Sequence, residues 1–135
     1  MAGLGAAYQN HVLDSVFGSH AAPYTPPANY WLELYTVIPT ATGGGTKVTG
    51  GSYARVEVAN TPTNFPAASG GSQPNGTAIL FPTATADWGT VVAFAWHDDP
   101  TADSIVAFGS IGTPVDVPSG STAAWGVGAL VATAA

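Results

Sequence analysis

The chain has 135 residues with only two basic and eight acidic side chains, for a formal net charge of −6, and it has no cysteine. This excludes disulfides and thiolate metal sites, and it disfavours nucleic acid and anionic membranes, whose phosphate groups are bound by Lys and Arg. The sequence has no signal-peptide pattern and no run of about 18 apolar residues, so we expect neither a secretion signal nor a membrane-spanning helix.

The N-terminal segment predicts one short helix. Apolar side chains recur at three- and four-residue spacing from Leu4 to Val16, which is typical of one helix face. Gly18 stands where a helix C-cap belongs, and the prolines that follow prevent continuation. We therefore expect an N-terminal helix and proline linker in residues 1–22 and a single β-domain in residues 23–135.

The remainder of the chain predicts short strands separated by turn residues. The expected strands are Tyr30–Ile38, Ser52–Ala59, Thr77–Phe81, Trp88–His97, Ser104–Ile111, Val115–Val117 and Thr122–Thr133. The nearly continuous apolar character of Trp88–His97 predicts a central strand buried on both faces. The pattern indicates a mainly β protein, an antiparallel β-sandwich of six to eight short strands with one short N-terminal helix.

Glycines and long connections add two further expectations. Gly126 and Gly128, within the last predicted strand, indicate close packing against a neighbouring backbone. Two long connections, 39–51 and 60–76, are expected to act as docking arms that become ordered only in an assembly.

One cluster has the residue types of a metal site. His97, Asp98 and Asp99 are consecutive, and Asp103 follows closely. Neighbouring residues at a strand end point to opposite faces, and no calcium-loop spacing follows. We therefore expect a turn whose carboxylates accept backbone N–H groups, and no metal site.

The sequence offers little for catalysis. No serine lies in a G-x-S-x-G elbow, and the GGGTK stretch at 43–47 lacks the register of a phosphate loop. Glu33 and Glu57 are interpreted as solvent-facing residues of amphipathic strands, with either of them able to pair with Arg55. A glycan hydrolase built on these two carboxylates is the least favoured hypothesis. We predict no enzyme, no catalytic residues and no cofactor.

The aromatic residues are the better candidates for function. Trp88 and Trp96 are expected in the core, whereas exposed Tyr and Trp side chains can stack on sugars or anchor a protein interface. The candidate interface residues are Tyr8, Tyr24, Tyr30, Tyr35 and Tyr53.

Several segments, in order along the chain, carry a family resemblance. They are LDSVFG (13–18), NYWLELYTVIPT (29–40), GGSYARVEVANTPTNFPAASGG (50–71), NGTAILFPTATADWGTV (75–91), FAWHDD (94–99), IVAFGSI (105–111) and VPSGSTAAWGVGALVAT (117–133). In these the chain resembles small tailed-phage virion proteins, commonly labelled tail fibre or minor tail protein and related to capsid decoration proteins. His97 departs from the pattern, since such proteins tend to have an aromatic or aliphatic residue there. The resemblance implies a virion structural subunit without catalysis or cofactor.

Together with this resemblance, the sequence predicts a non-enzymatic bacteriophage structural protein on the outer surface of the virion, made in the cytoplasm of the bacterial host. The main expectation is a decoration or minor capsid (cement) protein docked on the major capsid protein. The alternative is a minor tail or tail-fibre-type protein at the tail tip that binds a host cell-surface glycan. In both, the expected partners are other virion subunits and further copies of this chain, in a homo-oligomer such as a trimer.

Overall fold

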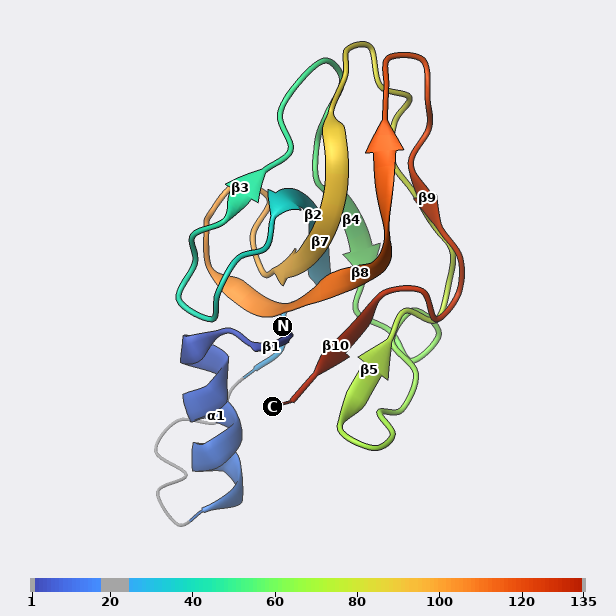
Figure 1. The fold of residues 1–135 in the computed structure, drawn as a ribbon. Helices are drawn as coiled ribbons and strands as arrows, with labels where there is room; N and C mark the ends of the chain where they lie inside the picture. The colour runs from blue at the N-terminus through green and yellow to red at the C-terminus, as the bar shows by residue number, and fades with distance from the viewer. Residues whose placement is uncertain (1, 18–24, 135) are drawn as a thin grey trace.

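The computed structural model describes residues 2–17 and 25–134. In this part of the chain the fold is mainly antiparallel β-structure with a single helix, α1 (Ala6–Val16) (Figure 1). The predicted fold class, a mainly β antiparallel sandwich with a short N-terminal helix, is confirmed. Among the described residues, no helix has the length and apolar character needed to cross a bilayer.

The largest sheet has six strands in the order β1-β8-β7-β2-β3, with β4 also pairing with β2. Its strands are β1 (Gly3–Leu4), β2 (Asn29–Val37), β3 (Thr46–Lys47), β4 (Val56–Ala59), β7 (Gly89–His97) and β8 (Ile105–Val117). The central strand β7 lies between β2 and β8, as its apolar sequence predicts.

Two small sheets accompany the large one. β5 (Ser72–Pro74) pairs with β10 (Val131–Thr133), and β6 (Ile79–Leu80) pairs with β9 (Ala124–Trp125). The main core contains residues of the large sheet, such as Leu34 and Phe94, together with Phe81, which follows β6, and Trp125 of β9. A smaller core contains Tyr35, Ala93, Ala95, Ile105 and Phe108.

The C-terminal strands differ from the prediction. The two strands expected at Ser104–Ile111 and Val115–Val117 are one strand, β8, which has 13 residues. Pro114 is accommodated because the register between β7 and β8 shifts from Val91↔Val115 to Ala93↔Ser110, so the residues between have no ladder partner.

The prediction of a single strand at Thr122–Thr133 is also wrong, because a turn divides this segment into β9 and β10. In this turn the Ala129 N–H donates to the Gly126 carbonyl, and Gly128 has a φ of +77°. A Cβ atom on Gly126 or Gly128 would meet nothing within 4 Å, so the predicted close packing against a backbone is wrong as well.

The buried side chain of Asn75 fixes this turn. Its Nδ2 donates to the carbonyls of Thr77 and Gly126, and its Oδ1 accepts the N–H of Leu130 at 2.9 Å. The Asn75 side-chain amide therefore connects the backbone at Thr77, Gly126 and Leu130. A hydrophobicity pattern does not reveal such a polar connection.

Both long predicted connections have hydrogen-bonded structure within the chain itself. The first contains β3, after which the Val48 N–H donates to the Leu34 carbonyl; in the second, the Gly76 N–H donates to the Asn64 carbonyl. The N-terminal residues also join the body, because β1 pairs with β8. Beyond β1, α1 extends away from the sheets (Figure 1).

Candidate interaction surfaces

Two of the five candidate tyrosines do not lie on the surface. Tyr35 is 1% exposed in the smaller core, and Tyr8 is 7% exposed at the base of α1. Tyr53 is half-buried: its ring contacts Trp88 with centroids 5.1 Å apart, and its hydroxyl accepts the Leu34 N–H. Tyr30 is also half-buried, whereas Tyr24 lies outside the described residues.

Tyr8 connects α1 to the body of the protein. Its hydroxyl donates a hydrogen bond to Oδ2 of Asp98, and its ring packs edge-on against His11. This contact lies near the first turn of α1. It therefore anchors the start of the helix to the body, whereas the end of the helix takes no part in it.

Glu33 is buried, so its interpretation as solvent-facing is wrong. Arg55 Nε donates to Glu33 Oε2 at 2.8 Å, and the two side chains are 7% and 5% exposed, respectively. The middle of β2 is covered on both faces, and Arg55 supplies the opposite charge that a buried carboxylate requires. Glu57 is exposed, as predicted.

Arg55 also binds two backbone carbonyls of the chain itself. Its Nη1 donates to the carbonyls of Asp99 and Ala102, each at 2.8 Å. The Asp99 carboxylate in turn accepts the N–H groups of Thr101 and Ala102, which lowers the pKa of Asp99. The predicted turn with carboxylate caps is therefore confirmed at Asp99.

His97 is fully buried beside this ion pair. Its Nδ1 lies 2.8 Å from the Ser104 carbonyl, and its Nε2 lies 3.4 Å from the Tyr35 hydroxyl. Burial, followed by the positive charge of Arg55, lowers the pKa of His97 to about 4, although the Ser104 carbonyl opposes this shift. Within residues 2–17 and 25–134, no three His, Asp or Glu residues are grouped as a metal would require.

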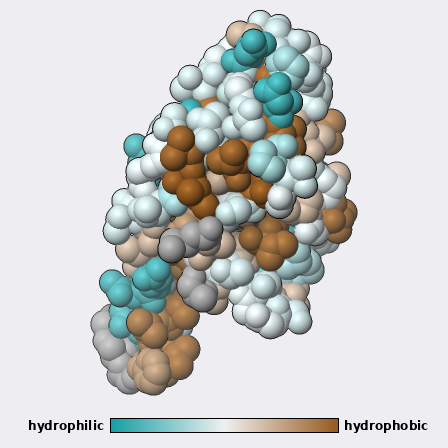
Figure 2. Space-filling view, in the orientation of Figure 1, coloured by the Kyte–Doolittle hydropathy of each residue, from teal (hydrophilic) through white to brown (hydrophobic). Residues whose placement is uncertain are grey.

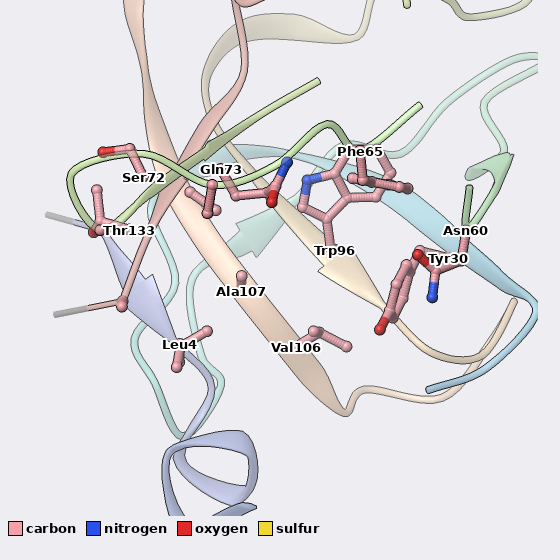
Figure 3. Close-up of a pocket in the computed structure, with 14 residues that line it drawn as sticks. Leu4, Tyr30, Asn60, Phe65, Ser72, Gln73, Trp96, Val106, Ala107 and Thr133 are labelled. Carbon is pink, nitrogen blue, oxygen red and sulfur yellow. The ribbon is translucent and has the colours of Figure 1, made fainter. Parts of the chain in front are cut away.

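An apolar cavity of about 340 Å³ opens between the large sheet and the small β5–β10 sheet (Figure 3). Aromatic rings form one wall: Phe65 packs edge-on against Trp96 and against Tyr30, with centroids 5.0 and 5.7 Å apart. Leu4 and Val106 line another part of the cavity. Phe65 and Gln73 were not expected here, because both belong to the connection predicted as a docking arm.

A second apolar surface lies at the end of α1. Val12, Leu13, Val16 and Phe17 are 47%, 53%, 67% and 65% exposed, respectively. They follow the three- and four-residue spacing of one helix face. Figure 2 shows an apolar area along this protruding part of the molecule.

The fold and these surfaces define a β-structural module whose buried charged groups pair internally and which presents apolar surface for contacts. The family comparison is specific: the chain belongs to the family of the podophage GP4 fiber I protein gp80, whose model matches residues 3–133. This places the chain among phage virion structural proteins, as its resemblance implied. The match supports the tail-fibre alternative better than the expected capsid decoration. A search of curated proteins gives no significant match.

Proposed function

We propose that this chain is a structural subunit of a phage tail fibre and acts by protein–protein contact. The observation that carries the proposal is the match to a phage fibre family over residues 3–133, which includes every described helix and strand of the fold. A match of this extent covers the whole fold of the described chain rather than one short shared motif.

The chemistry of the described residues supports a binding role over a catalytic one. The buried charges of Glu33 and Arg55 neutralise each other, and Arg55 also binds two backbone carbonyls. Burial disfavours the protonated form of His97 near neutral pH. These groups are therefore enclosed within the fold, while the cavity and the end of α1 remain available for contacts.

Host glycan binding stays a separate prediction. It rests on exposed Tyr and Trp side chains, yet of the four tyrosines that the structure describes only Tyr30 lines the cavity beside Trp96. We therefore give it no role in the proposal.

Head and tail fractions of disrupted virions test the proposal. An antibody against the chain should detect it in the tail fraction. The major capsid protein marks the head fraction, and an established tail protein marks the tail fraction. Gold-labelled antibody on intact virions should mark the tail. Detection only in the head fraction would contradict the proposal.

A further inference from the structure

The cavity contains a hydrogen-bond donor that has no acceptor among the described residues. Trp96 is 5% exposed and lines the cavity, and no hydrogen bond joins its indole N–H to any described residue. In Figure 3 the indole nitrogen is directed toward the Gln73 side of the cavity. The Gln73 amide nitrogen already donates to the carbonyls of Pro66 and Pro74. An occupant should therefore be mainly apolar and carry an acceptor for the indole N–H.

The end of α1 has the complementary chemistry. Val16 and Phe17 are two-thirds exposed apolar side chains. The last carbonyls of a helix have no partner within it, and the last turn of α1 has no basic side chain to bind them. At the C-cap, the described residues give one such carbonyl a partner: the Leu13 carbonyl accepts the Phe17 N–H. This helix end thus offers apolar side chains beside main-chain acceptors.

The helix end cannot occupy the cavity of its own chain. Leu4, two residues before α1, lines the cavity, so the helix starts beside it. The 11 residues of α1 span about 16 Å, which places Phe17 far from that starting point. Figure 1 shows α1 directed away from the sheets.

We propose that the end of α1 of one copy docks in the Trp96 cavity of a second copy. Phe17 and Val16 of the first copy fill the apolar volume, and a carbonyl of the last helical turn accepts the indole N–H. The two surfaces are different parts of the same chain, so the contact is head-to-tail and closes into a ring when the rotation between copies permits. This inference concerns the isolated chain and does not depend on where it lies in the virion.

Crosslinking at Phe17 tests the contact directly. Phe17 is replaced by its photo-reactive benzoyl analogue, and the purified full chain is irradiated and digested for mass spectrometry. We expect covalent oligomers with crosslinks to cavity residues such as Phe65 and Val106. Crosslinks that join position 17 only to α1 of another copy, or an absence of oligomers at every concentration, would overturn the proposal.

Matched variants and light scattering complete the test. A Val16→Ser, Phe17→Ser double variant should be monomeric at concentrations where the unaltered chain is oligomeric. A Leu80→Ser, Val127→Ser variant removes equally exposed apolar side chains elsewhere and should leave the oligomer intact. Trp96→Phe keeps a ring but removes the N–H, and should weaken association by about five- to tenfold. Equal association of all three variants would overturn the proposal.

Discussion

Arg55 and Glu33 form an ion pair in which both side chains are more than nine-tenths buried, with Nε and Oε2 separated by 2.8 Å. Arg55 precedes β4 and Glu33 lies in the middle of β2, so the pair joins two segments that are 22 residues apart. Removing one partner leaves the other charge buried and uncompensated, which is far more costly than losing an exposed pair.

Arg55→Met should therefore lower the free energy of unfolding by about 3–5 kcal/mol. The double variant Arg55→Met, Glu33→Leu should recover much of this loss, because no unpaired charge remains. Glu57→Gln, at an exposed position nearby, is the control and should change stability by less than about 0.5 kcal/mol. Urea unfolding followed by tryptophan fluorescence measures all three. Equal losses for Arg55→Met and the double variant would contradict this account of the pair.

His97 should make stability depend on pH between about 6.5 and 4. Its pKa is lowered from 6.5 to about 4 in the folded state, so the unfolded chain binds the proton first as the pH falls. The contribution of neutral His97 is complete above pH 6.5 and is lost progressively toward pH 4, by about 3 kcal/mol in total. Urea unfolding across this range measures the loss.

The control for this prediction is His97→Leu, judged by the slope of stability against pH rather than by absolute stability. The variant should have a nearly flat profile between pH 6.5 and 4.5. Asp99 and Asp103, whose pKa values are lowered by their hydrogen bonds, lose their contributions only below their ordinary value of 3.8. An unchanged slope in the variant would show that another group titrates in this range.

Tyr8→Phe should loosen α1 without unfolding the sheets. The variant loses the hydrogen bond from the Tyr8 hydroxyl to Asp98, with a cost of about 1–2 kcal/mol. Hydrogen exchange should therefore accelerate at the α1 amides, while exchange in β7 and β8 changes little. Ser15→Ala, which removes only an exposed bond to the Val12 carbonyl, should leave exchange in the first turn of α1 unchanged. Uniform acceleration throughout the sheets would contradict this assignment.

Gly128 and Gly126 provide a matched pair within one turn. Gly128→Ala should destabilise the fold by about 1–2 kcal/mol, because Gly128 has a φ of +77°. Gly126→Ala should have little effect, since Gly126 does not have a positive φ and a Cβ there would meet open space. Thermal unfolding of the two variants measures the difference. Equal losses would indicate that side-chain crowding, rather than backbone conformation, governs this turn.

The strands with strong hydrophobic patterns could be predicted from the sequence. The expected Trp88–His97 strand is β7, and the expected Tyr30–Ile38 strand is β2, each within one residue at either end. Such segments are long enough for burial to dominate over local turn preferences.

The errors have a common physical cause, since each depends on a partner distant in the sequence. Glu33 has the alternation of a solvent-facing residue, and only Arg55 makes its burial favourable. Alternation also continues through Gly126 and Gly128, where Asn75 holds a turn from 51 residues away. The sequence does not predict the cavity, because Phe65, from a connection expected to become ordered only in an assembly, must meet Trp96 of β7.

The number of copies of this chain in each virion tests the central claim, that it is a fibre subunit of the tail, most directly. Quantitative mass spectrometry of purified virions gives this number relative to the major capsid protein. A tail-fibre subunit should be present at a small fraction of the major capsid protein, at a level comparable to other tail proteins. A number on the same order as the major capsid protein would contradict the claim and indicate a capsid decoration protein instead.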